Sequence, residues 1–387
     1  MSAPLLTLDS LRSRFARHPE SLIDIMDGIE ARFAAFDNAS IPAALSAAAR
    51  DLLARCPDPS NLPLWGMPYV VGANIDVVGL PTSTGVPALD FEPDFDAVVV
   101  ERLRAAGALL VGKAPVDPLG LDASAAGVAA AIAAELAVFG IASDRTGAAC
   151  IQAAGSGVVV IKPSPGRVVP DGLFATAHEL DGVVILASDL EGGATVRRII
   201  ERTDEDERRA APFGRLGLLG GTSAAARCVA ERLDLATVAV EEALFVEVAT
   251  LMGEDAWLVL RLDDVAVPLA ELPEQFPSRL RKRLNGALGC SSCDLLRLQR
   301  RLSELRNRIE ATFADCDLLF VPPESNLTGF LNPCGLAAVA MPDLGTLIAP
   351  SGSDDRLADA AQILATLNLP RSTRPIDILA SSPLAHR

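Results

Sequence analysis

Five side chains between positions 124 and 156 could act as nucleophiles on a carbonyl carbon. Each has a hydroxyl or thiol group, and together they are Ser124, Ser143, Thr146, Cys150 and Ser156. Such groups attack an amide only when a neighbouring base takes their proton or the surroundings stabilise their anion. The nitrogen bases of the chain are few, namely His18, His178, His386, Lys113, Lys162 and Lys282. The chemistry to consider is therefore acyl transfer, and the main argument against it is the small number of residues that could act as the base.

The local sequence favours structural roles for most of these groups. His178 follows a loop-like segment, which favours a polar residue at the surface over a catalytic base. Cys150 is flanked by apolar residues, and Arg145 is the one nearby charge that would favour its thiolate, so a buried filler is the preferred interpretation. Ser124 precedes an alanine-rich segment and could cap a helix there. A rebuilt nucleophile at Ser124 or Cys150 is the alternative.

Composition limits the class of protein. Half of the 387 residues are hydrophobic and 22% are charged, which suffices for a large core. The formal net charge of −16 opposes binding to nucleic acid and to anionic membranes. Seven cysteines and the lack of a recognisable signal peptide favour reduced thiols in a cytoplasm. Cys290 and Cys293 form a single CxxC pair without a second pair or a nearby histidine, so we expect neither a metal nor another cofactor.

The spacing of apolar residues predicts the elements that would position such a site. Residues 1–60 have leucine, isoleucine and phenylalanine three or four positions apart, so we expect an N-terminal helical part. From residue 61 onward, short β-branched runs alternate with helical stretches, which predicts an α/β fold with helices on the faces of a sheet. Residues 61–387 contain no repeat and no low-complexity linker, and we expect them to form one compact unit.

Two segments need a closer look. The run 125–142 is interrupted only by Glu135 and has nearly the length of a membrane span. It consists mainly of alanine, which is weakly apolar, so a buried helix is predicted instead. Residues 295–313 place apolar side chains three or four apart with charges between them, which predicts an amphipathic helix lying on the body.

A series of motifs follows these elements along the chain. They are LWGMPYVVGANIDV at 64–77, AVVVERLRAAGA at 97–108 leading into VGK at 111–113, VVIKPSPGRV at 159–168, AAVAMP at 337–342 and TLIAP at 346–350. Together they resemble the amidase signature family, most closely the amidase domain of the allophanate hydrolase type. The resemblance implies a mixed β-sheet core covered by helices and a serine, cis-serine and lysine hydrolase site. A fold can be inherited without its activity.

The resemblance also locates the catalytic positions. Gly72 stands where the family has the lysine base, and Ala148 stands where it has the nucleophilic serine. Ser124 corresponds to the relay serine, in a loop that is shorter here than in the family. Backbone N–H groups around Thr146 and Gly147 would be the remnant of the oxyanion hole. Because loss of one member of such a unit typically costs on the order of 10⁴ to 10⁶ in rate, we expect a catalytically inactive protein.

The sequence thus predicts an inactive amidase-signature homologue in the cytoplasm that acts as a scaffold, a small-ligand binder or a non-catalytic subunit. The ligand would be a small amide or carboxylate. The partner would be a second copy, since the resemblance makes dimers plausible, or an active enzyme of urea-type nitrogen metabolism. An active hydrolase for small urea- or amide-type substrates, with a rebuilt nucleophile, is the alternative.

Overall fold

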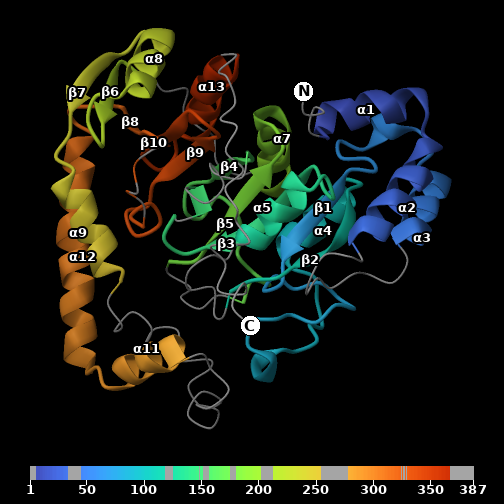
Figure 1. Cartoon of the computed structure of the whole chain (residues 1–387), viewed down its shortest axis with the longest axis horizontal. Coiled ribbons are helices and arrows are strands. Elements are labelled where there is room, and N and C mark those ends of the chain that lie inside the picture. The colour runs from blue at the N-terminus through green and yellow to red at the C-terminus, as the bar shows by residue number, and fades with distance from the viewer. Residues whose placement is uncertain are drawn as a thin grey trace.

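A ten-stranded mixed sheet forms the centre of the molecule, and helices pack around it (Figure 1). The strand order is β2-β1-β3-β5-β4-β9-β10-β8-β6-β7. This architecture comes from a computed structural model, which describes residues 6–33, 45–117, 125–147, 149–150, 157–174, 180–201, 212–253, 278–323, 325, 327 and 329–366. The predicted α/β fold with a mixed sheet covered by helices is confirmed.

The strands are short and almost all buried. They are β1 (Pro68–Gly72), β2 (Leu109–Ala114), β3 (Phe139–Asp144), β4 (Val159–Lys162), β5 (Gly182–Ala187), β6 (Arg215–Leu218), β7 (Ala236–Ala239), β8 (Leu318–Val321), β9 (Ala337–Met341) and β10 (Gly345–Ala349). The helices are α1 (Leu8–Arg17), α2 (Ser21–Phe33), α3 (Leu45–Arg55), α4 (Val98–Ala105), α5 (Ala126–Ala133), α7 (Leu190–Ile200), α8 (Ala224–Leu233), α9 (Ala243–Leu251), α11 (Ser278–Leu288), α12 (Ser292–Thr312) and α13 (Asp354–Ala365). Two 3₁₀ turns, η1 (Pro59–Asn61) and η2 (Pro87–Leu89), lie in the connections.

The first three helices cover one edge of the sheet, at the right of Figure 1. The Thr7 side chain caps α1 by accepting a hydrogen bond from Ser10 N–H, as a capping box requires. Phe15 of α1 meets Trp65 edge to face, with ring centroids 5.4 Å apart. Helices α2 and α3 contact β2, all six residues of which are buried. This cover protects an edge strand that would otherwise offer unpaired backbone groups. The division of the chain at residue 60 stays a prediction.

The alanine-rich run at 125–142 is not one helix, as the sequence predicted, but a short helix followed by a strand. Helix α5 ends at Ala133, and Glu135 adopts a left-handed backbone with φ of 56°. The chain then turns back into β3, which pairs in parallel with β1. At Gly140 an added Cβ would lie 2.5 Å from Val128 Cγ1. The small residues therefore allow α5 to pack closely on the sheet. Composition alone does not distinguish such a helix and strand from one longer helix.

The other half of the sheet carries β8, β9, β10, β6 and β7, with α9 and α12 side by side along the left of Figure 1. Helix α12 confirms the predicted amphipathic helix, because Leu302, Leu305 and Ile309 on one face are buried. The paired segments at 337–342 and 346–350 form the antiparallel strands β9 and β10. Within the described ranges, no helix is both long enough and apolar enough to cross a membrane.

Candidate functional site

The candidate site lies at the end of the sheet where the parallel strands β1, β2 and β3 finish. Gly72 ends β1 and pairs with Ala114, the last residue of β2. Asp144 ends β3 and pairs with Gly182, the first residue of β5. Ligands of open α/β sheets commonly bind outside the carboxyl ends of the strands, so this is where a site is expected.

Gly72 leaves little free space beside it. A Cβ at this position would lie 2.9 Å from Asn74 Oδ1 and 3.6 Å from Val116 Cγ1. Asn74 Nδ2 donates a 2.8 Å hydrogen bond to Ser143 Oγ, which ties the end of β1 to β3. Asn74 Oδ1 is buried and has no hydrogen-bond partner among the described residues. The direction in which a lysine side chain would leave the strand is thus partly occupied by a polar group.

Lys113 does not lie beside Gly72, where the sequence led us to look for a base. It precedes Ala114, the partner of Gly72, and neighbours along a strand point to opposite faces. Its ammonium group donates to Pro81 O at 2.7 Å and to Thr82 Oγ1 at 3.2 Å. Burial lowers the pKa of Lys113 to about 8, and the charge of Asp76 opposes this effect. Lys113 is therefore held on the far face of the sheet.

Lys162 lies at the same end of the sheet as the candidate site, but its ammonium group is hydrogen-bonded to backbone carbonyl groups. It ends β4, and its ammonium group donates to Leu336 O at 2.7 Å and to Pro163 O at 3.2 Å. Burial lowers its pKa, and the charges of Asp144 and Cys150 oppose this effect. The third lysine, Lys282, is exposed on α11.

The loop after β3 is organised by the carboxylate of Asp144. Asp144 Oδ1 accepts hydrogen bonds from Thr146 N–H at 3.2 Å and Gly147 N–H at 3.0 Å. Burial raises the pKa of Asp144, and the bond from Gly147 is the largest opposing effect. The two donors that the sequence proposed as an oxyanion remnant are therefore occupied by the protein's own carboxylate. An anionic ligand would have to displace Asp144 from them.

The segment after β8 closes this loop from the other side. Asn332 Nδ2 donates to Asp144 O at 2.6 Å and to Leu180 O at 2.9 Å, across 188 residues in the first case. Gly147 has φ of 93°, and a Cβ there would lie 2.6 Å from Leu331 Cβ. Only glycine fits both the left-handed backbone and the contact with Leu331.

Cys150 is a buried thiol in this structure. Its relative exposure is 0%. Burial raises its pKa, and the negative charge of Asp144 adds to the effect. A thiolate is the reactive form of cysteine, so this environment weighs against Cys150 as an alternative nucleophile.

Charged groups from several elements act on Arg145, which lies in the loop after β3. Burial lowers the pKa of the Arg145 guanidinium, the nearby charges of Asp181 and Asp117 oppose this effect, and Arg283 adds to it. Asp117 follows β2, Asp181 precedes β5 and Arg283 belongs to α11. Helix α11 therefore lies within electrostatic reach of the candidate site. Asp144 also acts on Arg145, so this cluster has three anions and two cations and offers no positive excess charge to attract an anionic ligand.

Other predicted site residues cannot be placed. Ser124, Ala148, Ser156 and His178 lie outside the described residues. The described N-cap of α5 is Ala125, which makes no side-chain capping bond. In the part of the chain that the structure describes, no group of three or more histidine, cysteine, aspartate or glutamate side chains could hold a metal ion.

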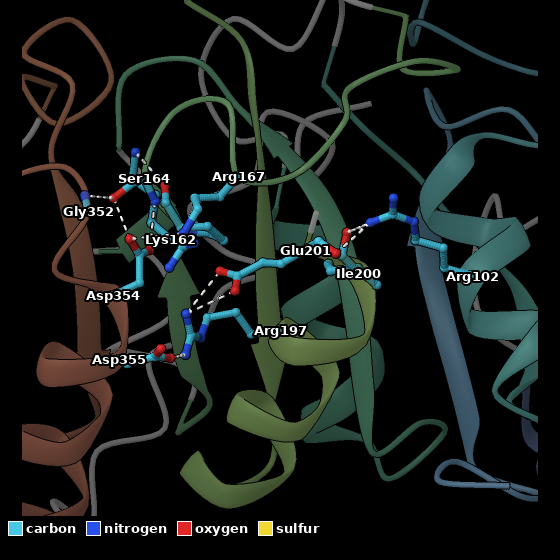
Figure 2. A network of polar contacts seen from close by, with 11 residues as sticks. Arg102, Lys162, Ser164, Arg167, Arg197, Ile200, Glu201, Gly352, Asp354 and Asp355 are labelled. Carbon is cyan, nitrogen blue, oxygen red and sulfur yellow. Dashed lines mark hydrogen bonds and ion pairs between the residues drawn. The ribbon is translucent and has the colours of Figure 1, made fainter. Parts of the chain in front are cut away.

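A buried polar network lies beside Lys162 and joins β4 to α7 and α13 (Figure 2). Asp354 accepts hydrogen bonds from Ser164 N–H at 2.8 Å and Ser164 Oγ at 2.5 Å. Arg197 of α7 bonds Glu201 at 3.0 Å and also pairs with Asp355 of α13. Since the charged groups of this network pair with one another, the network fixes the elements around the site and is not itself a candidate site.

Sequence reasoning missed Asn74, Leu331 and Asn332. Asn74 belongs to the motif at 64–77, two positions after Gly72, and this proximity could have identified it as a residue of the candidate site. Leu331 and Asn332 belong to an irregular segment far along the chain, and nothing in their local pattern indicates contact with residues 144–147.

Comparisons with known proteins identify the family and the fold of this chain. The family model described as Amidase matches residues 20–125 and 121–240. The chain is 32% identical over 237 residues to a subunit of the glutamyl-tRNA(Gln) amidotransferase from Solidesulfovibrio magneticus, covering 54% of this chain and 48% of that protein. The chain therefore spans about half the length of that relative.

Two solved structures share the fold. Allophanate hydrolase of Kluyveromyces lactis superimposes with a TM-score of 0.80 at 22% identity, covering 97% of this chain and 74% of that chain. A protein described as part of a vestigial complex that reveals the origins of an s-triazine catabolic enzyme gives a TM-score of 0.74 at 21% identity, covering 95% and 99%. At these identities the similarity shows the fold alone.

Proposed function

Because the chain belongs to the amidase signature family, we propose that it is a catalytically inactive member that acts as a non-catalytic subunit of a protein assembly. The single observation that carries this proposal is the location of the lysines. The family position of the base is Gly72, Lys113 and Lys162 bind backbone carbonyls, and Lys282 is exposed on α11. None of the three stands at the end of β1.

The filled surroundings of the loop after β3 favour a role in an assembly over small-ligand binding. The N–H groups of Thr146 and Gly147 are engaged by Asp144, and Leu331 packs directly on Gly147. A small amide or carboxylate would have to break these contacts before it could bind. Desolvated polar groups that are already satisfied gain little from such an exchange.

The names of two similar proteins agree with an assembly role. One relative is a subunit of an amidotransferase, and one structural neighbour belongs to a vestigial complex. We propose that this chain likewise works in an assembly, either with a second copy or with an active enzyme of urea-type nitrogen metabolism, in the cytoplasm. The net charge of −16 supports a protein partner over nucleic acid or an anionic membrane.

The proposal is tested by a thermal-shift screen and an ammonia-release assay on the purified full chain. The probes are allophanate, biuret, urea, malonate and simple aliphatic amides. We expect no ammonia above that released by a heat-denatured sample, because among the described residues no lysine or histidine stands at the end of β1, where the family resemblance places the base. Stabilisation by a probe without ammonia release would favour a small-ligand binder over a member of an assembly.

Ammonia release that survives repurification would overturn the proposal and favour a rebuilt active site. In that case Ser143→Ala and Cys150→Ser distinguish the described candidate nucleophiles, and Ser124→Ala tests the retained relay serine. Loss of at least about a hundredfold in rate would be expected for the variant that lacks the nucleophile.

A further inference from the structure

Two oppositely charged surfaces lie at the lower end of the molecule in Figure 1. One is the loop after β1, drawn in blue to cyan around η2, and the other is α11 with the start of α12, drawn in orange. Neither surface belongs to the candidate site at the strand ends, although Arg283 on α11 reaches toward it.

The first surface, here called the acidic surface, combines exposed rings with carboxylates. Phe95 is 79% exposed and Phe91 is 40% exposed. Between and beside these rings stand the exposed side chains of Asp90, Glu92 and Asp94. Exposed aromatic residues of this size are unusual on a protein surface and commonly mark a contact region.

The loop that presents the acidic surface is held in place by the rest of the protein. Thr82 and Phe91 exchange two backbone hydrogen bonds of 2.7 and 3.1 Å. Asp96 accepts a 2.8 Å bond from Val78 N–H and pairs with Arg104 at 2.6 Å. A fixed loop loses little conformational entropy when it binds, which favours recognition by a partner.

The second surface, here called the basic surface, has the opposite charge. Residues 278–288 of α11 have the sequence SRLRKRLNGAL, with four basic residues and no acidic one. Lys282 is exposed and Arg281 half-exposed, and neither forms an ion pair with a described residue. The first turns of α12 add Leu296, which is 63% exposed, and Arg297, whose side chain is 77% exposed. Arg297 pairs with Asp294 in the same turn, so the basic character of this surface rests on α11, and Leu296 is its exposed apolar side chain.

We propose that these surfaces bind each other between two copies of this chain related by a two-fold axis. In such a dimer the acidic surface of each copy contacts the basic surface of the other, so both contacts form at once. The two surfaces satisfy this geometry because they lie toward the same end of the molecule. Opposite charge and matched apolar side chains select a second copy over an unrelated acidic or basic partner. The proposal does not depend on whether the site is catalytic.

The test measures the mass of the full chain in solution by light scattering and sedimentation, at low salt and at about 1 M salt, where screening is nearly complete. The wild type is expected to be a dimer that dissociates at high salt. Two variants each reverse one surface: D90K/E92K/D94K for the acidic surface and R281E/K282E for the basic one. Each should weaken dimerisation at least about tenfold, since like charges then face each other.

Mixing the two reversed variants gives the sharpest readout. In the mixture every contact again pairs opposite charges, so a heterodimer should form although each variant alone is monomeric. The control E231K/D359K reverses exposed acids on α8 and α13, at the upper end of Figure 1, and should dimerise like the wild type. Thermal unfolding verifies that every variant is folded, and Phe95→Ser provides a second, uncharged variant that should also weaken the dimer.

Three results would each overturn the proposal. The first is a wild type that stays monomeric at about 100 μM in low salt, where contacts of this type are strongest. The second is a dimer that neither reversal weakens. The third is a pair of monomeric reversed variants whose mixture does not associate.

Discussion

At the residue scale, the face of a strand decides whether a lysine can serve the site. Lys113 is one position before the residue that pairs with Gly72, yet it points to the opposite face and bonds Pro81 and Thr82. A shift of one position in a strand exchanges the two faces of the sheet. Proximity in register therefore does not bring the Lys113 side chain to the candidate site, and Lys113 instead stabilises the loop after β1.

The pH dependence of stability should report the buried position of Lys113. Its folded-state pKa of about 8 lies below the ordinary value of 10.5, so the unfolded chain binds more protons between these values. Stability contributed through Lys113 therefore rises as pH rises through this window and is lost as pH falls. Relative to Lys113→Met, the wild type should gain about 1–3 kcal/mol in free energy of unfolding between about pH 8 and pH 10.

Urea unfolding at several pH values measures this difference. Lys282→Met is the matched control, because Lys282 is exposed on α11 and its replacement removes a lysine without changing the core. Curves for the wild type and Lys113→Met that run parallel across the window would contradict the buried location of the charge.

Gly147 allows a second prediction at this scale. Gly147→Ala forces a Cβ to within 2.6 Å of Leu331 in a left-handed backbone, whereas Gly157, with φ of 74°, has no atom within 4 Å of an added Cβ. Gly157→Ala should cost about 1–2 kcal/mol from backbone strain alone, and Gly147→Ala about 2–4 kcal/mol. Chemical denaturation measures both. Combining Gly147→Ala with Leu331→Ala should cost less than the sum of the single changes, and strict additivity would contradict the contact.

At the element scale, the helices around the site are fixed by the ion pairs of a buried arginine. Arg197 of α7 is 2% exposed and binds Glu201 and Asp355, which joins α7 to α13. Arg102 of α4 donates to Ile200 O at 2.6 Å and Glu201 O at 2.7 Å, at the end of α7. Three helices that are distant in sequence therefore share one polar network beside β4, as Figure 2 shows.

Removing Arg197 should destabilise the protein strongly. Arg197→Met leaves Glu201 buried without its cation, and breaking a buried pair on one side typically costs about 3–5 kcal/mol. Arg198, the next residue of α7, is exposed, so Arg198→Met should change stability by no more than about 0.5 kcal/mol. Thermal and urea unfolding of the two variants decide the matter. Equal losses would show that the network contributes no more than the helix surface.

Much of the fold was predictable because its strands have strong local patterns. The β-branched runs at β1 and β4 and the paired segments at β9 and β10 are short, apolar and bounded by turn residues. The structure of the alanine-rich run at 125–142 was not predictable, since alanine suits both a helix and a close-packed strand. The change from helix to strand depends on the left-handed backbone of Glu135. The contact of Asn332 with Asp144 spans 188 residues and has no local signal. Of the predicted site, Gly72, Thr146, Gly147 and Cys150 fall among the described residues, and the inactivity of the site stays a proposal.

At the scale of the whole molecule, the sheet end is assembled from segments spread over most of the chain. Gly72, Asp144, Lys162 and Leu331 come from four different segments, and each is held by contacts that suit the present residues. We therefore expect that side-chain changes alone would not complete a catalytic unit at this end of the sheet, because position and surroundings supply most of the rate.

Restoring the two missing side chains tests this view. In the variant Gly72→Lys with Ala148→Ser the fold should persist once the Asn74 side chain, whose Oδ1 would lie 2.9 Å from the new Cβ, moves aside, since Gly72 has no left-handed backbone. Ammonia release from allophanate and simple amides should nevertheless stay within about threefold of the wild type, because Asp144 already holds the N–H groups of Thr146 and Gly147. Thermal unfolding verifies the fold, and Ala148→Ser alone is the control. Activity at least about a hundredfold above that control would mean that the loss of two side chains, and not the rebuilding of the surrounding loops, separates this chain from an active amidase.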